Sequence, residues 1–274
     1  MQIIDLSLPI DDTAFEPFPV RINRLDHGKG GDRLGWRVAV SRRRGIWANI
    51  KGVLGYITGK RRITRRSFPN KEFLALERVS AIVHTGTHLD APYHFGSRSE
   101  GKRAKMIEEV PLEWCYGNGV VLDFSHKRGG ELITQQDIKE ALQKIRYEIE
   151  PLDIVLIRTG ADRYWGEEGY FRNFPGVSKE ALAFILKKGV KIIGVDAYSL
   201  DRPFHLMFQD FFETHDNRYL WPTHLYGREK EYCHIERLAN LDKIPRPYGF
   251  KVACFPIKIK GASASWVRAV AIIE

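Results

Sequence analysis

The segment HTGTHLDAPYHF, at residues 84–95, constrains the fold more than any other part of the chain. It places His84, His88, Asp90 and His94 within eleven positions, all at even spacing. In an extended chain, residues separated by two or four positions project from one face, so an extended stretch would present all four side chains together. Imidazole nitrogens and carboxylate oxygens bind zinc and similar ions at about 2.0–2.2 Å. The segment therefore predicts a metal site.

The residues between these donors agree with that prediction. Gly86 and Thr87 are small enough to let the backbone pass close to an ion, and Pro92 is typical of an edge or a turn beyond a strand. A single histidine is usually an ordinary surface or core residue. Four donors at even spacing, in a chain with nine histidines, favour a metal site instead.

A second group of candidate donors lies far downstream, in WPTHLYGREKEYCHIERLANLD at residues 221–242. The same residues could instead form a solvated helix with alternating charges and one buried histidine. The residues alone do not decide which members of the group reach the first segment: His224, Glu229, Glu231, His234 or Glu236.

Hydrophobic periodicity predicts one mixed α/β domain for residues 1–274, because strands and helices alternate in the middle of the chain and strands alone occupy both ends. Thr134 and Ser178 are expected to cap helices, and Gly189 is expected to end one. The expected strands are 3–10, 77–86, 119–125, 153–160, 190–196, 250–259 and 265–273. The expected helices are 46–60, 134–145 and 178–189.

The formal net charge of +9 is concentrated in one basic segment, residues 33–71, which has twelve Lys or Arg and no Asp or Glu. The rest of the chain is therefore close to neutral. A basic amphipathic helix can lie on a membrane surface, and clustered Lys and Arg can bind nucleic acid. We favour an inserted helix that covers the active site or packs across a subunit interface, because its apolar face is short. Nucleic acid is not a favoured partner.

Cysteine usage and hydropathy suggest a cytoplasmic protein. The three cysteines are odd in number and widely spaced, which fits free thiols in a reducing compartment. The chain has no run of about 18 apolar residues, so no transmembrane segment is predicted. The N-terminal residues are interpreted as a first strand and not as a signal peptide.

The first segment resembles the HxGTHxDxPxH signature of the cyclase family, which includes bacterial kynurenine formamidase and isatin hydrolase. The similarity continues, in the family's order, through about three-quarters of the chain, and the basic segment 33–71 is the main departure. The further stretches are IDLSLPI, DIVLIRTG, FPGVSKEA, KIIGVDAYSLD and VRAVAI.

The resemblance implies a swivelling β/β/α fold, a homodimer or homotetramer, and one or two divalent ions per chain, zinc or manganese. Asp90 matches the carboxylate that bridges both ions, and His94 matches the histidine proposed to transfer protons. His94 could instead be a further ligand or an anchor. The positions that match ligands are His84, His88 and Asp90 for the first ion, with His224 and Glu236 for the second.

These residues predict a metal-dependent hydrolase that cleaves a C–N amide bond in a small molecule, such as an aryl formamide or a lactam. A bound divalent ion lowers the pKa of water to about 7, and a histidine can carry the proton to the leaving nitrogen. One alternative is a cyclase or dehydratase in which the ion stabilises an enolate. Another is a non-catalytic metal-bearing scaffold whose basic arm binds a membrane or nucleic acid.

The surroundings of the donors are open to two interpretations. The aromatic stretch 204–222 could wall a pocket for a flat substrate, or it could be a core-packing loop. Its histidines, His205 and His215, are not expected to bind metal. Asp196, Ser199 and Asp201 could orient ligands, or they could form a strand end and a turn.

Overall fold

The computed structural model describes residues 1–41 and 45–274, which form two compact units. The larger unit comprises residues 1–19 and 82–274, and the smaller one comprises Val20–Ala81. The basic segment 33–71 lies within the smaller unit, except that residues 42–44 lie outside the described part. That this segment is an insertion in one functional domain stays a prediction.

The larger unit is built on a nine-stranded mixed sheet with the order β1-β15-β13-β7-β9-β11-β12-β4-β14. The strands β7, β9, β11 and β12 run parallel, and the strands beyond them pair antiparallel. The mixed α/β prediction is therefore confirmed. The bounds are β1 Gln2–Asp5, β4 His88–Asp90, β7 Tyr116–Asp123, β9 Ile154–Arg158, β11 Ile192–Val195, β12 Cys233–Glu236, β13 Phe250–Ala253, β14 Ala264–Trp266 and β15 Val270–Ile273.

The central strands are buried on both faces, which explains their continuous apolar runs. In β9, Val155 and Ile157 pack into the core on the helical side of the sheet. Ile154 and Leu156 pack into a second core on the opposite side. This alternation follows from the two-residue period of a strand.

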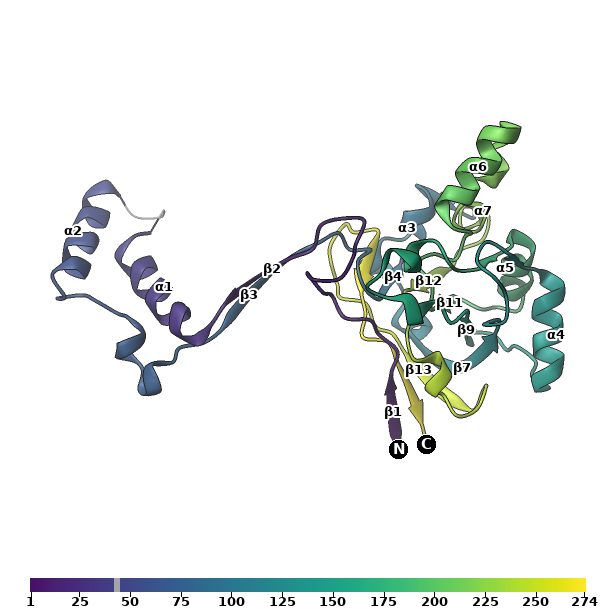
Figure 1. The fold of residues 1–274 in the computed structure, drawn as a ribbon, viewed down its shortest axis with the longest axis horizontal. Helices are drawn as coiled ribbons and strands as arrows, with labels where there is room; N and C mark the ends of the chain where they lie inside the picture. The colour runs from purple at the N-terminus through teal and green to yellow at the C-terminus, as the bar shows by residue number, and fades with distance from the viewer. Residues whose placement is uncertain (42–44) are drawn as a thin grey trace. The chain divides into compact units, whose positions relative to one another are not determined.

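Two helices, α4 (Gln135–Ile145) and α5 (Lys179–Lys187), contribute apolar side chains to the core on the helical side. Figure 1 shows them side by side, next to the parallel strands. The Thr134 hydroxyl accepts from the Asp137 N–H at 3.2 Å, and the Ser178 hydroxyl accepts from the Ala181 N–H at 3.1 Å. Both predicted caps are confirmed, because each satisfies an N–H that has no partner within its helix.

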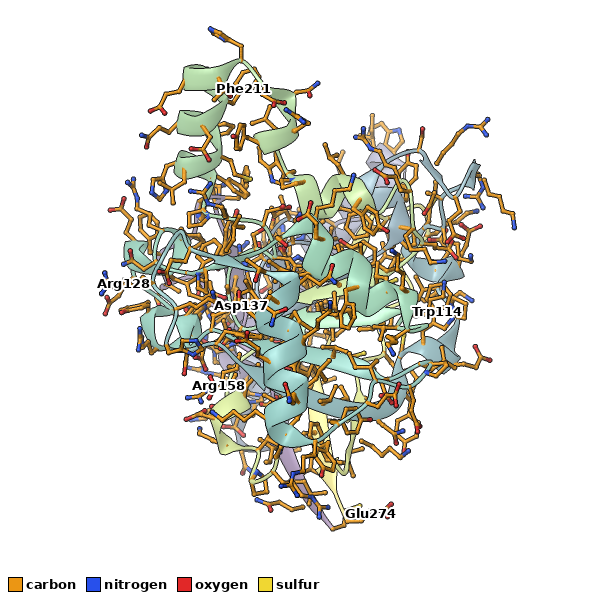
Figure 2. All side chains as sticks on the ribbon, turned by 90° about the vertical axis from the view of Figure 1, so that its right-hand side faces the viewer. Trp114, Arg128, Asp137, Arg158, Phe211 and Glu274 are labelled. Atoms are coloured by element: carbon orange, nitrogen blue, oxygen red, sulfur yellow. The ribbon has the colours of Figure 1, made fainter. Side chains whose placement is uncertain are left out.

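Three further helices belong to the larger unit: α3 (Pro92–Phe95), α6 (Phe204–Thr214) and α7 (Pro222–Tyr226). Helix α6 projects from the body of this unit in both views, with Phe211 near its outer end (Figures 1 and 2). Its one buried residue is Met207, so most of the aromatic stretch 204–222 is a projecting helix and not a core-packing loop. The remaining strands of this unit form short two-stranded ladders: β5 Arg98–Ser99, β6 Lys102–Arg103, β8 Leu132–Ile133 and β10 Gly176–Val177.

Two sequence predictions for the strands are wrong in detail. The expected strand 265–273 is interrupted between β14 and β15, and these two strands pair with different partners. The expected strand 77–86 ends at Ser80 and belongs to the smaller unit. Both errors arise because apolar runs report burial, whereas strand pairing is set by contacts distant in sequence.

The smaller unit contains a β-ribbon and two packed helices. Strands β2 (Arg21–Leu25) and β3 (Leu76–Ser80) pair antiparallel, and helices α1 (His27–Ala39) and α2 (Ile46–Ile57) contact each other. The predicted helix within 46–60 is confirmed, although it has no buried residue. No helix among the described residues has both the length and the apolar character needed to span a bilayer.

Candidate metal centre

The first group of donors comes from three consecutive local structures. His88 and Asp90 lie on β4 and project from the same face of the strand. His84 precedes a turn at Gly86, where a φ of +63° favours glycine, and His94 lies in α3. The prediction of one extended stretch from 84 to 94 is therefore wrong, although the four side chains still converge. The turn and the helical turn redirect the two outer histidines toward the strand.

The second group of donors reaches β4 through the neighbouring strand. β12 pairs antiparallel with β4, so that His234 lies opposite Asp90 and Glu236 lies opposite His88. Directly opposed residues on one face have Cβ atoms about 4.5–5.5 Å apart. His224 comes from α7, which begins at Pro222. Sheet register thus brings residues about 145 positions apart in the chain into one cluster.

One side of the cluster is formed by His84, His88 and Asp90. The Asp90 Oδ1 atom lies 2.8 Å from His84 Nδ1 and 3.5 Å from His88 Nε2. His88 Nε2 is buried without a hydrogen-bond partner, and Asp90 Oδ1 is buried with its short contact to His84 as its one close polar neighbour. A buried polar atom without a partner is costly, and a cation between these donors would satisfy both.

The other side uses the second oxygen of Asp90. The His234 Nε2 atom lies 2.7 Å from Asp90 Oδ2 and 3.3 Å from Glu236 Oε1. His224 Nε2 lies 3.5 Å from Glu236 Oε1. The donor atoms of these four residues lie within 4.8 Å of one another. Asp90 therefore offers one oxygen to each side, as a carboxylate between two cations does.

Contacts behind the donors set the orientation of two rings. The His88 Nδ1–H donates to the Gly86 carbonyl at 2.9 Å, and the His224 Nδ1–H donates to Asp201 Oδ2 at 2.5 Å. Each contact leaves Nε2 facing the cluster with its lone pair, which is the arrangement that metal-binding histidines adopt. Asp201 also accepts from the backbone N–H groups of Thr223 and His224. Of the two interpretations of Asp201, the structure supports an orienting contact.

The electrostatics of the cluster favour bound cations. Burial lowers the pKa of His88 and of His94 to about 4, so both rings are neutral at pH 7. Burial opposes ionisation of Asp90 and Glu236, but the surrounding histidines outweigh it. They hold the pKa of Asp90 well below its usual range and lower that of Glu236 to about 2. Neutral imidazoles and ionised carboxylates are the protonation states that metal binding requires. The carboxylates outweigh burial at two further rings, raising the pKa of His84 and raising that of His234 to about 10, so a cation at His234 would have to displace a proton.

One edge of the cluster is open to solvent. The side chains of His94 and His84 are 31% and 24% exposed, whereas those of His88, Asp90 and His234 are fully buried. His94 Nε2 lies 4.0 Å from Asp90 Oδ2, and its ring lies 4.2 Å from that of His84 between centroids. A small molecule would therefore enter past His84 and His94.

The remaining candidates lie outside the cluster. Glu229 pairs with Lys179, and Glu231 pairs with Lys105. A cavity of about 740 Å³ near α5, α6 and α7 is lined by Glu229 and by residues of the stretch 204–222 such as Met207, Tyr219 and Pro222, but by none of the clustered donors. His205 and His215, which were not expected to bind metal, are exposed on or beside α6.

His234 is the cluster residue that sequence reasoning left undecided. Its signal is the even spacing from Glu236, which puts both side chains on one face of a strand. The even spacing identifies His234 only if residues 233–236 form a strand. The charged residues just before them suggested a helix instead.

The model of the family described as "Putative cyclase" matches residues 4–202. The chain belongs to this family. The match covers more than half of the chain and includes the whole first donor segment. The resemblance inferred from the sequence is thereby confirmed.

Curated relatives of this cyclase-family chain are named as amide-cleaving enzymes. Kynurenine formamidase of Bacillus cytotoxicus is 30% identical over 128 residues, which is 45% of this chain and 52% of that protein. The chain thus spans about half the length of that relative. Kynurenine formamidase of Bacillus cereus is 25% identical over 74% of this chain and 84% of its own. Isatin hydrolase of Roseibium aggregatum is 25% identical over 69% and 72%, respectively.

Solved structures show the same fold. An isatin hydrolase bound to the product analogue thioisatinate superposes with a TM-score of 0.70 at 20% identity, covering 99% of this chain and 92% of that one. Isatin hydrolase A from Ralstonia solanacearum gives a TM-score of 0.69 at 21% identity, covering 100% and 92%. The described part of the chain therefore has the same fold as these structures.

Proposed function

We propose that this protein is a metal-dependent hydrolase of C–N amide bonds in small molecules. The observation that carries the proposal is the convergence of imidazole and carboxylate donors on Asp90, whose two oxygens face two separate groups of ligands. The buried and unpartnered His88 Nε2, 3.5 Å from the buried Asp90 Oδ1, fits a cation at this position. Zinc and manganese both accept this mixture of nitrogen and oxygen donors.

In the proposed site, His84, His88 and Asp90 hold a first divalent cation, and His224 and Glu236 join Asp90 in holding a second. Bound cations supply Lewis acidity, which polarises a carbonyl and acidifies water. Burial of Asp90 and Glu236 strengthens their attraction for cations because the surroundings have a low dielectric constant. The open edge beside His84 and His94 leaves room for the substrate carbonyl.

His94 is the proposed proton carrier. Its ring is neutral at pH 7 and lies at the solvent-exposed edge, so a nitrogen lone pair is available to accept a proton. As the oxygen of water attacks the carbonyl carbon, His94 takes the proton that the water loses. When the C–N bond breaks, His94 returns the proton to the leaving nitrogen. The products are a carboxylic acid and an amine, with one water consumed.

The proposed substrate class is an aryl formamide, a lactam or a similar cyclic amide. The support comes from relatives named kynurenine formamidase and isatin hydrolase. A homodimer or homotetramer and a cytoplasmic location stay predictions, for which size-exclusion chromatography with light scattering and cell fractionation are the measurements.

Elemental analysis followed by a substrate screen tests the function. Purified protein should contain zinc or manganese, and it should hydrolyse at least one aryl formamide, lactam or cyclic imide with a mass gain of about 18 Da across the products, the mass of one water. The cyclase or dehydratase alternative predicts no such gain. The non-catalytic alternative predicts metal content without turnover of any member of the screen. Either result would refute the proposed hydrolysis of these classes.

A further inference from the structure

We propose that His234 is a direct ligand of the second cation. The resemblance to the cyclase family assigned this cation Asp90, His224 and Glu236, and His234 adds a second imidazole to that set. The inference rests on the proposed function to the extent that a divalent cation binds at the cluster. It further implies that the two cations have different tasks.

The position of His234 is set by the sheet and not by a flexible loop. It lies on the same face of β12 as Glu236 and directly opposite Asp90 on β4. On the other side of β4, the residue paired with Asp90 is Ala264, which carries no donor. His234 is fully buried, so a rotation of its ring into solvent is not available to it.

The distances around His234 fit a shared cation. Four ligands at about 2.0–2.2 Å in tetrahedral geometry lie roughly 3.3–3.6 Å from one another. His234 Nε2 and His224 Nε2 lie 3.3 Å and 3.5 Å from the same Glu236 Oε1 atom. The shorter distance of 2.7 Å from His234 Nε2 to Asp90 Oδ2 is a hydrogen-bond distance. It would lengthen by about half an ångström when a cation takes the place of the proton.

The other ring nitrogen of His234, Nδ1, lies beside a hydroxyl group that can accept a hydrogen bond from it. Its Nδ1 lies 3.5 Å from the Tyr232 hydroxyl, which itself donates to the Thr223 carbonyl at 3.0 Å. The hydroxyl oxygen therefore has lone pairs left to accept the Nδ1–H. Once a cation displaces the Nε2 proton that faces Asp90, this tautomer leaves the Nε2 lone pair facing the two carboxylates, as at His88 and His224.

With His234 as a ligand, the two cations would have different roles, one structural and one open to substrate. Two imidazoles and two carboxylates complete a tetrahedral shell for the second cation, which is the closed arrangement of structural zinc sites. The first cation has three donors and lies at the exposed edge, beside His84 and His94. The open coordination positions therefore belong to the first cation, and the second holds Asp90 and Glu236 in place. Two imidazoles also favour zinc over manganese at the second position.

Metal binding, measured without any substrate, tests this inference. The apoprotein, His234→Leu and the control His205→Ala are titrated with zinc against a chromophoric chelator, and bound metal is counted by mass spectrometry. The control removes an exposed histidine on α6. We expect two zinc ions per chain in the wild type and the control. We expect His234→Leu to keep the first ion and to bind the second at least about ten-fold more weakly. Equal affinities in all three proteins would overturn the inference.

A second measurement on the wild type guards against a variant that fails to fold. Protein with ¹⁵N-labelled histidine is loaded with ¹¹³Cd²⁺, and ring nitrogens coupled to cadmium are observed by NMR. The inference expects coupling to Nε2 of His234 as well as of His224. An imidazole of His234 protonated at both nitrogens and uncoupled from cadmium would refute it.

The outcomes separate this inference from the proposed function. If His234 binds the second ion but no amide is hydrolysed, the ligand assignment stands and the function fails. If amides are hydrolysed and the metal affinity of His234→Leu is unchanged, the function stands and the ligand assignment fails.

Discussion

Replacing Asp201 with asparagine should weaken metal binding although Asp201 contacts no proposed cation. Its Oδ2 accepts from His224 Nδ1–H at 2.5 Å and from the His224 backbone N–H at 3.1 Å, and its Oδ1 accepts from the Thr223 N–H at 2.8 Å. In Asp201→Asn, one oxygen becomes an NH₂ group that cannot accept. With the remaining oxygen on the Thr223 N–H, this NH₂ faces His224 Nδ1 and also opposes the His224 backbone N–H. The NH₂ group can only donate, so it favours the tautomer that has its proton on Nε2.

The magnitude follows from that change of tautomer. His224 Nε2 would then carry a proton toward Glu236 Oε1, where the cation is expected. Loss of such an orienting partner typically lowers metal affinity about 10–100-fold, or roughly 1.4–2.7 kcal/mol. The fold should be retained, since the two residues have nearly the same shape.

Chelator competition on apoprotein measures the effect, with Asp216→Asn as the matched control. Asp216 contacts Arg218 in the loop after α6 and touches no donor of the cluster. We expect the second metal-binding step to weaken in Asp201→Asn and to be unchanged in the control. An Asp201→Asn protein that binds both ions as tightly as the wild type would show that the hydrogen bond does not set the tautomer of His224.

Three further predictions concern the rate, the cations and stability. His94→Ala should keep the wild-type metal content but lose about 10²–10⁴-fold in kcat, and a loss of metal instead would make His94 a ligand. Removal of metal by a chelator should abolish turnover, and zinc or manganese should restore it; turnover by verified metal-free protein would contradict this. Glu16→Gln should lower the free energy of unfolding by about 3–5 kcal/mol, because it leaves the buried Arg237 guanidinium without its carboxylate. Urea denaturation measures this change, and an unaltered midpoint would argue against it.

The sequence by itself determined those features that depend on neighbours along the chain. Thr134 and Ser178 could be assigned as caps because a cap bonds a backbone N–H only three residues away. The even spacing of His84, His88, Asp90 and His94 predicted that these side chains converge, because they needed little more than a local bend to do so. The apolar run in 153–160 predicted a strand buried on both faces, and each face of this strand packs against a hydrophobic core.

Tertiary structure alone decided that His234 joins His224 and Glu236 beside Asp90. The spacing of the residues left five candidate donors open, and the family resemblance favoured two of them. The five are His224, Glu229, Glu231, His234 and Glu236, and the favoured two are His224 and Glu236. The antiparallel register of β4 and β12 selects His234 and Glu236, and Lys179 and Lys105 engage the other two acids. Register is set by the packing of the whole sheet, so one residue of slip would have turned both donors away from Asp90. For that reason His234, fully buried beside Asp90, was recognisable only once the strands were paired.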